Sequence, residues 1–221
     1  MKINIVFPYN IWSGAFKSTY ELSNRMSLLG HDVKIYIPFF PFLTQSRSIT
    51  DSVSIFLKGI LRSSIRWNRV HWFDLKVPIK IVPLIHNNFI RDADIIISNH
   101  YPSAFSVAKL SQKKGRKFNF IRDTKFLPLE IEAFKLPFER IVVSSWLEDY
   151  LKNDLGLSVA GVVPNGTNMS DFEVKDRIYN DIPVVCMMFY DHPVKGMNDG
   201  FKALTKMRNE FPEIKIRMFG L

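Results

Sequence analysis

The chain opens with a short, largely apolar run that gives way to a helical repeat and then to a second apolar run. Residues 3–7 and 33–37 form the two runs, and the helical pattern between them ends at Gly30. Strands with so little polarity are typical of a parallel sheet that is covered on both faces. The opening segment therefore predicts a β-α-β unit with a right-handed crossover, and the fold class is α/β.

Strands and helices continue to alternate after a long irregular stretch. Residues 38–90 show no regular pattern apart from one amphipathic segment at 52–67. Farther along, the apolar pattern predicts strands at residues 94–98, 117–122, 140–144 and 159–163. Residues 1–163 are therefore expected to form one Rossmann-like domain built on a parallel sheet.

Single residues mark the predicted helix ends in this domain. Pro102 is typical of the first turn of a helix. Ser145 and Glu148 predict a capping box at the start of another helix, and Gly156 is expected to end it.

The chain changes character after residue 163. Residues 164–182 are turn-rich and charged, which indicates a connection between domains. A second β-α-β pattern follows over residues 183–221, and its helix is predicted at 199–210. The inward face of that helix is expected to hold Phe201, Leu204, Met207 and Phe211. A lone β-α-β unit cannot bury both faces of its sheet, so we expect an incomplete second Rossmann-like unit.

The net charge of +9 bears on the kind of partner. Excess positive charge raises the rate of encounter with a phosphorylated substrate, an anionic lipid or a nucleic acid. No helix-turn-helix, zinc-finger or aromatic RNA-binding signature accompanies the charge, which argues against nucleic acid. The one cysteine, Cys186, lies in an apolar strand and is expected to be buried, so disulfides and cysteine-bound metals are excluded.

Hydropathy and charge also bear on location. No stretch approaches the roughly 20 apolar residues that cross a bilayer, and the first residues lack an apolar leader, so we expect a cytoplasmic protein. The amphipathic segment at 52–67 is accompanied by a basic ridge, which consists of Lys58, Arg62, Arg66 and Arg69. Such a helix either lies on an anionic membrane surface, as a peripheral attachment, or packs its apolar side on the domain with its charges in water.

Two candidate sites follow the strands of the first domain. Gly14, after Ser13, lies where the first strand turns into a helix, so a ligand can approach the backbone and meet helix amides. A turn glycine without a ligand fits equally well. His100 follows the strand at 94–98 and is expected at the carboxyl edge, where α/β sheets bind ligands. Its imidazole either hydrogen-bonds a sugar hydroxyl or only caps backbone.

Two pairs of adjacent residues are further candidate site residues. Arg122 and Asp123 end another predicted strand and either hold a polar acceptor or form an ion pair in a loop. Lys195 and Gly196 precede the helix of the second unit, where a lysine either neutralises phosphate or is simply solvated. The motifs of zinc proteases, serine hydrolases, P-loop NTPases and dinucleotide-binding proteins are absent from the sequence, so hydrolase and P-loop NTPase functions have no support and no cofactor is expected.

The order of these features resembles the retaining glycosyltransferases of family 4, which have the GT-B fold of two Rossmann-like domains. The likeness spans nearly the whole chain, and its pieces are residues 13–15, 29–33, 94–100, 142–147, 163–166 and 195–196. Residues 118–123 and 145–147 are most similar to the branch that includes bacterial rhamnosyltransferases of surface polysaccharide synthesis.

The resemblance implies transfer of a sugar from a nucleotide-diphosphate-sugar, as co-substrate, to a hydroxyl of a polysaccharide or lipid-linked glycan, with retention and without a required metal. Residues 1–163 would be the acceptor-side domain, and residues 183–221 would begin the donor-binding domain. The residues matched to the donor phosphates are Gly14, Lys195 and Gly196. His100 would be the catalytic residue that touches the transferred sugar, and Ser13, Arg122 and Asp123 would bind the acceptor.

The chain also departs from the family pattern. Phe189 and Tyr190 stand where the family has a Gly-Arg pair for the diphosphate, and Ser13 stands where a glycine is usual. The family's Glu-x7-Glu segment is not reached before Leu221, so we expect this polypeptide alone not to transfer sugar. The alternatives are a noncatalytic carbohydrate- or membrane-binding module and a nucleotide-binding scaffold. A homodimer through the edge of the incomplete second sheet is a further expectation.

Overall fold

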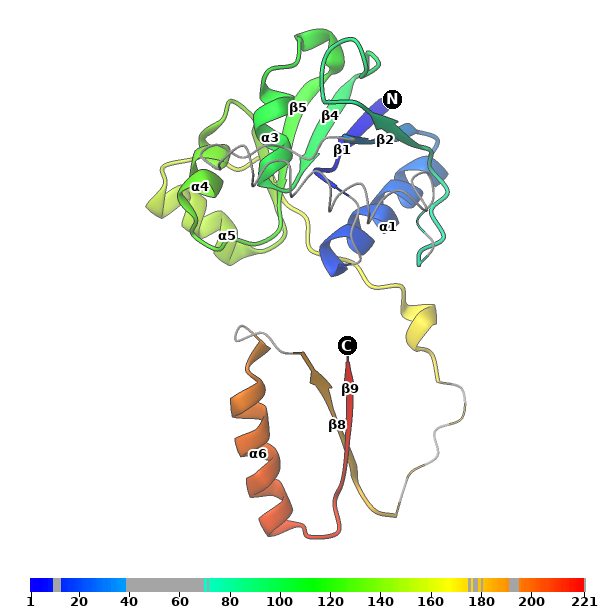
Figure 1. Cartoon of the computed structure of the whole chain (residues 1–221), viewed down its shortest axis with the longest axis vertical. Coiled ribbons are helices and arrows are strands. Elements are labelled where there is room, and N and C mark those ends of the chain that lie inside the picture. The colour runs from blue at the N-terminus through cyan, green and yellow to red at the C-terminus, as the bar shows by residue number, and fades with distance from the viewer. Residues whose placement is uncertain are drawn as a thin grey trace. The chain divides into compact units, whose positions relative to one another are not determined.

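The computed structural model describes residues 1–9, 13–38, 70, 72–174, 176, 179, 181–190 and 195–220. The chain divides into two compact units, Met1–Thr167 and Asn168–Leu221, and each is described by itself (Figure 1). The division after Thr167 falls within the connection predicted at 164–182. The basic ridge predicted at Lys58, Arg62, Arg66 and Arg69 lies outside the described residues.

A seven-stranded parallel sheet forms the centre of the first unit, which confirms the predicted α/β class. Its strands, in spatial order, are β3 (Ile79–Val82), β2 (Asp32–Pro38), β1 (Lys2–Val6), β4 (Ile95–Asn99), β5 (Arg116–Ile121), β6 (Glu139–Val142) and β7 (Gly161–Val162). The order reverses direction between β1 and β4. In an open α/β sheet, such a reversal leaves a crevice for ligands beyond the carboxyl ends of the two strands.

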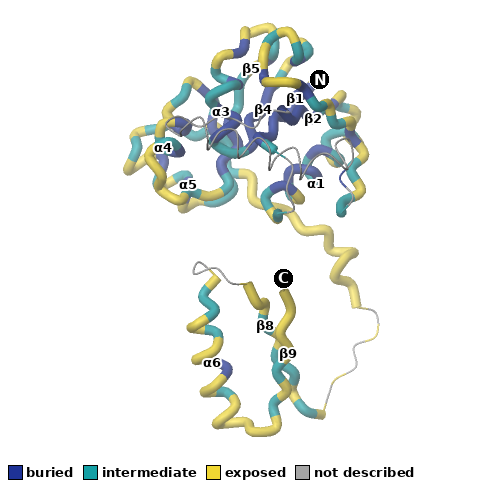
Figure 2. Tube along the Cα trace, in the orientation of Figure 1, coloured by how far each residue is buried: buried dark blue, intermediate teal, exposed yellow. Residues whose placement is uncertain are grey.

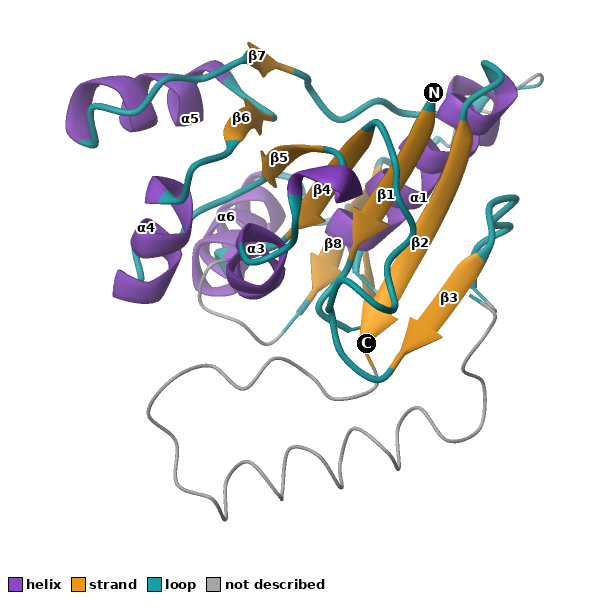
Figure 3. Cartoon of the chain, turned by 90° about the horizontal axis from the view of Figure 1, so that it is seen from above, coloured by secondary structure: helices purple, strands orange, loops and turns teal. Residues whose placement is uncertain are grey.

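Neighbouring residues of each strand face opposite layers, so the sheet is covered on both sides (Figure 3). Ile5 packs in the cluster that contains Phe16 of α1 (Gly14–Leu28). Val6 packs in the cluster that contains Val107 of α3 (Tyr101–Ala108) and Ala133 of α4 (Pro128–Lys135). The buried centre of this unit, visible in Figure 2, explains why its strands read as apolar runs.

Helix ends agree with the sequence in three places and disagree in one. Pro102 lies in the first turn of α3, and Gly30 and Gly156 follow helix ends with φ of 84° and 64°, as predicted. The capping box predicted at Ser145 and Glu148 is wrong. Helix α5 (Ser145–Asp149) has Ser144 as its N-cap, without a side-chain cap, and Glu148 instead forms an ion pair with Lys152. The chain continues directly into a π-helical turn, η2 (Tyr150–Asp154), and a separate short helix is η1 (Gln112–Lys114).

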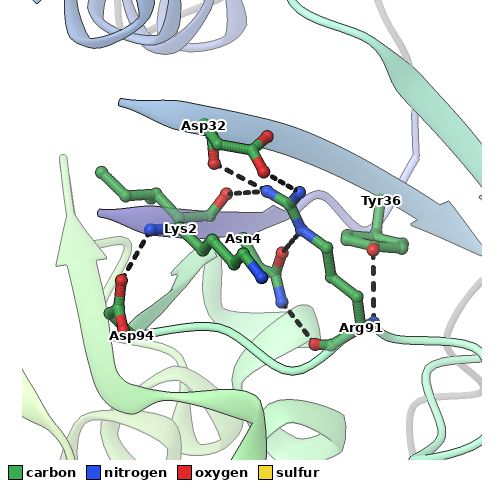
Figure 4. Close-up of polar contacts among 7 residues, drawn as sticks. Lys2, Asn4, Asp32, Tyr36, Arg91 and Asp94 are labelled. Carbon is green, nitrogen blue, oxygen red and sulfur yellow. Dashed lines mark hydrogen bonds and ion pairs between the residues drawn. The ribbon is translucent and has the colours of Figure 1, made fainter. Parts of the chain in front are cut away.

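Arg91 ties the amino ends of the central strands together (Figure 4). Its Nε donates to Asn4 Oδ1 of β1 at 3.0 Å, and its Nη2 donates to the backbone carbonyl of Asp32 of β2 at 2.6 Å. The ion pair between Arg91 Nη1 and Asp32 Oδ2 spans 2.5 Å, and this hydrogen bond lowers the pKa of Asp32. The brace therefore fixes the edge of the sheet opposite to the predicted ligand crevice.

The second unit contains the predicted β-α-β pattern. It consists of the short helix η3 (Met169–Phe172), the parallel strands β8 (Val184–Phe189) and β9 (Lys215–Gly220), and α6 (Met197–Glu210). Leu204 of α6 is buried, but Phe201 and Phe211 are exposed, so the predicted inward face is wrong at those two positions. A single pair of strands offers the helix too little surface to cover all its apolar side chains.

Cys186 is exposed, which corrects the expectation of a buried thiol. Its neighbour Met187 faces α6, because a Cβ built at Gly200 would lie 2.5 Å from Met187 Sδ. Adjacent residues of a strand point to opposite faces, so Cys186 lies on the face that α6 leaves uncovered.

Candidate functional site

The candidate site of the first unit lies at the carboxyl edge of the parallel sheet. His100 directly follows β4, Arg122 directly follows β5, and Gly14 begins the helix that follows β1. Because all strands are parallel, these chain segments leave the sheet at the same edge. The topology therefore places three of the predicted site residues on one side of this unit.

His100 has a strained backbone. Its φ is 81° and its ψ is 141°, a conformation that non-glycine residues rarely adopt. The carbonyl of His100 accepts hydrogen bonds from the Ser103 amide at 3.1 Å and from the Ser103 hydroxyl at 2.8 Å. The first turn of α3 thus holds His100 in a conformation that is unfavourable by itself.

The partly buried imidazole of His100 lies beside two aromatic rings. The ring centroids of Tyr9 and Tyr101 lie 6.2 Å and 5.0 Å from that of His100. Burial lowers the pKa of His100, although the carboxylates of Asp123 and Glu130 partly oppose this. A neutral imidazole follows at neutral pH. Its Nδ1 is buried and has no hydrogen-bond partner among the residues that the structure describes.

Arg122 is a hub of hydrogen bonds rather than a free cation. Its guanidinium donates to Asn99 Oδ1 at 3.3 Å, to Thr19 Oγ1 at 2.6 Å and to Asn165 Oδ1 at 3.0 Å, and it also donates to Ser18. Burial lowers the pKa of Arg122 to about 10, so the group remains charged at neutral pH.

This hub connects elements that are far apart in the sequence. Ser18 and Thr19 belong to α1, Asn99 is the last residue of β4, and Asn165 lies after β7. Since Asn99 immediately precedes His100, the Arg122 contacts hold the start of α1 beside the end of β4. Arg122, which the sequence assigned to acceptor binding, also holds these elements in position in this geometry. Asp123 is exposed beside it.

Ser13 and Gly14 differ in what they offer a ligand. Ser13 is the N-cap of α1, and its Oγ accepts a hydrogen bond from the Phe16 amide at 3.3 Å. Gly14 is exposed, and a Cβ added to it would meet no described atom within 4 Å. The packing of the described protein atoms therefore does not require a glycine at this position.

The remaining predicted residues form a separate candidate site in the second unit. Lys195 is exposed, and Gly196 is the N-cap of α6 with φ of 64°, where glycine is favoured. The start of α6 thus combines a lysine with the first amides of a helix, which have no partner within the helix, and this combination attracts phosphate. Phe189 and Tyr190, at the positions where the resemblance to family 4 leads one to expect a Gly-Arg pair, are both 43% exposed.

Sequence reasoning missed Glu130, which shapes the loop after Arg122. Glu130 is only 4% exposed, and its carboxylate accepts hydrogen bonds from the Thr124 hydroxyl at 2.9 Å and the Lys125 amide at 2.7 Å. The available signal was an acidic residue in the first turn of a helix, which also suits a solvent-exposed position. Within the described part of the chain, no three His, Cys, Asp or Glu residues are grouped to hold a metal ion. Nor does any helix in that part have the length and apolar character to span a membrane.

The fold defines a Rossmann-like α/β protein of the kind found in GT-B glycosyltransferases. The catalytic domain of starch synthase IV from Arabidopsis thaliana, bound to ADP and acarbose, matches 99% of this chain and 68% of its own, with a TM-score of 0.59 and 11% identity. A glycosyltransferase from Rickettsia africae ESF-5 matches the same shares, with a TM-score of 0.51 and 13% identity. No family model and no curated protein matches the sequence.

Proposed function

We propose that the chain belongs to a glycosyltransferase that moves a sugar from a nucleotide-diphosphate-sugar to a hydroxyl acceptor. The fold shared with two glycosyltransferase structures supports this class of reaction. The acceptor is a polysaccharide or lipid-linked glycan, and the transferred sugar is a hexose or deoxyhexose such as rhamnose.

The protonation, hydrogen bonding and backbone conformation of His100 give the proposal its main support. Its imidazole is neutral, one of its nitrogens has no described partner, and its strained backbone holds it at the carboxyl edge of the sheet. Strain of this kind is concentrated at functional sites because it persists only where the surroundings enforce it. A neutral imidazole both donates and accepts hydrogen bonds, which suits the hydroxyl of a transferred sugar.

Each unit has a helix start that carries a glycine and suits a donor phosphate. The exposed backbone of Gly14 begins α1, and Lys195 with Gly196 precedes α6. Amides at a helix start favour an anion, and the lysine adds a full positive charge. Gly14 is the candidate in the first unit, and Lys195 and Gly196 are the candidates in the second.

The reaction proceeds with retention at the anomeric carbon. The bond from that carbon to the phosphate oxygen breaks while its bond to the acceptor oxygen forms on the same face. The acceptor proton passes to the departing phosphate oxygen. The protein's contribution is to position the reactants and to stabilise charge, and no metal is required.

Binding of nucleoside diphosphates to the purified chain tests the proposal. The wild type is titrated with UDP, GDP, ADP and dTDP in saturation-transfer NMR, beside Lys195→Ala and the matched control Lys206→Ala on α6. We expect one or more of these compounds to bind, with affinity reduced about tenfold by Lys195→Ala and unchanged by the control. Binding of glycans without affinity for any nucleoside diphosphate would contradict the proposal and favour the noncatalytic carbohydrate module.

A further inference from the structure

The loop between β5 and α4 holds a large aromatic side chain out in solvent. Phe126 is 58% exposed and has φ of 57°, in the left-handed region. A bulky side chain in this region is a genuine outlier, because its Cβ approaches the following carbonyl. A loop selected only to connect two elements would place glycine or asparagine at such a position.

Hydrogen bonds to Thr124 and to the buried residue Glu130 support this conformation. The Phe126 amide donates to the Thr124 hydroxyl at 3.0 Å, and that hydroxyl donates to Glu130 Oε2 at 2.9 Å. The Lys125 amide donates to the same carboxylate oxygen at 2.7 Å. Burying a carboxylate is unfavourable unless it is well hydrogen-bonded, so Glu130 and the loop support each other. These hydrogen bonds therefore support the loop conformation in which the Phe126 ring is exposed.

Phe126 is part of a larger aromatic surface. Its ring packs edge-to-face on Tyr150, with 5.2 Å between the centroids. Trp146 lies four residues before Tyr150 at the start of the same helical segment, so the two share a helix face, and Trp146 is 52% exposed. We call Phe126, Trp146 and Tyr150 the aromatic shelf.

We propose that the aromatic shelf binds a sugar ring of an uncharged acceptor glycan. This inference rests on the proposed function, because it assigns the acceptor to the first unit. The loop that carries Phe126 begins at Arg122 and Asp123, at the same carboxyl edge as His100. One face of a pyranose ring presents C–H groups, which carry slight positive charge and stack on the negative face of an aromatic ring.

The charges around the shelf favour a neutral ligand over an anionic membrane. Lys125 is close in sequence to Asp123, and Lys152 is paired with Glu148 at 2.7 Å. Asp149 adds a further negative charge. A membrane-binding patch depends on several unbalanced lysines or arginines next to its apolar residues. These residues provide no such excess, whereas an uncharged sugar needs none.

Two variants remove the rings without disturbing the loop. Phe126→Gly accepts positive φ and deletes the ring, and Trp146→Ala deletes the indole from an exposed helix position. Leu29→Ala is the matched control, because Leu29 is also a large apolar residue that is exposed (75%), and it lies at the C-terminal end of α1 rather than in the shelf. The probes are the methyl pyranosides of glucose, galactose, mannose and rhamnose. Their binding is measured by saturation-transfer NMR and by the shift of the Trp146 indole N–H signal.

We expect at least one pyranoside to bind the wild type and shift the Trp146 signal. Each ring deletion should weaken that binding by about 3- to 10-fold, while Leu29→Ala leaves it unchanged. Unchanged binding in both ring variants, or no binding of any probe, would overturn the proposal. Binding to phosphatidylcholine vesicles that is lost in Phe126→Gly, without pyranoside binding, would also overturn it and identify a lipid surface.

The same variants separate this proposal from the proposed function. Phe126→Gly should bind nucleoside diphosphates as the wild type does, because the ring takes no part in phosphate recognition. Ring-dependent pyranoside binding in a chain that binds no nucleoside diphosphate would support the shelf and contradict the glycosyltransferase assignment. If the chain binds a nucleoside diphosphate but its pyranoside binding does not depend on the rings, the glycosyltransferase assignment would be supported and the shelf proposal contradicted.

Discussion

Arg122 donates a hydrogen bond from Nη2 to Thr19 Oγ1 over 2.6 Å and thereby joins the end of β5 to the first helix. The two residues are far apart in sequence, and Thr19 Oγ1 also lies 3.0 Å from Asn99 Oδ1. Three elements around the proposed ligand crevice therefore share one buried polar cluster. Such clusters stabilise a unique arrangement when every member is satisfied, and they are destabilising when one member is removed.

Replacing Arg122 by alanine should lower the free energy of unfolding by about 2–4 kcal/mol, because the side-chain oxygens of the buried residues Thr19 and Asn99 lose a donor. Arg122→Lys should recover only part of this loss, since an ammonium group cannot reproduce the planar fork of donors. Urea unfolding measures both values. If Arg122→Ala were as stable as the wild type, the cluster would not have the positioning role assigned to it.

Gly14→Ala should separate folding from ligand binding. A Cβ at this position meets no described atom within 4 Å, so we expect the free energy of unfolding to stay within about 1 kcal/mol of the wild type. Affinity for a bound nucleoside diphosphate should fall, because the added methyl group occupies the space assigned to the phosphates. Thermal unfolding and titration of the same preparations check both statements. Unchanged affinity would mean that Gly14 is only a turn residue.

Acidification should destabilise the protein through His100. Burial holds its pKa below the ordinary value, whereas an unfolded histidine titrates near pH ~6.5. As the pH falls through that value, the unfolded chain binds a proton that the folded chain does not, so the free energy of unfolding decreases. His100→Gly should show a smaller difference between urea midpoints at about pH 7.5 and 5.5 than the wild type. An equal difference would contradict a buried, neutral imidazole.

Arg91→Ala should destabilise the first unit without affecting ligand binding. The side chain is 22% exposed and bonds to Asn4 and to Asp32, so its loss should lower the free energy of unfolding by about 2 kcal/mol. Lys76→Ala, which removes an exposed ion pair with Asp74, is the control and should change little. A loss of ligand affinity equal to that of Gly14→Ala would show that the variant disturbs the crevice from the opposite edge.

The sequence predicted the parts of the fold that depend on local pattern. Buried strands such as β1 and β4 carry a nearly continuous apolar run, and Gly30 and Gly156 mark helix ends because positive φ favours glycine. Strand β3 was missed. Its four residues, Ile79–Val82, are too short to stand out within an irregular stretch, and their strand character depends on pairing with β2.

The candidate site was predictable only in its position along the strands. The end of β4 marked His100, but neither its positive φ nor the burial of its imidazole follows from nearby residues. The same holds for Glu130, whose burial depends on how α4 packs on the sheet. Arg122 was expected to meet a ligand, yet its hydrogen bonds join residues from distant parts of the chain. Such contacts arise from tertiary packing, which local pattern does not contain.

Comparing the affinities for a sugar nucleotide and for its parent nucleoside diphosphate tests the role of His100 most directly. His100 is proposed to contact the sugar and not the phosphates. The account therefore predicts that His100→Gly loses the extra affinity that the sugar provides, while its affinity for the nucleoside diphosphate stays at the wild-type value. The control His31→Ala should keep both affinities. An unchanged preference for the sugar nucleotide in His100→Gly would contradict the account.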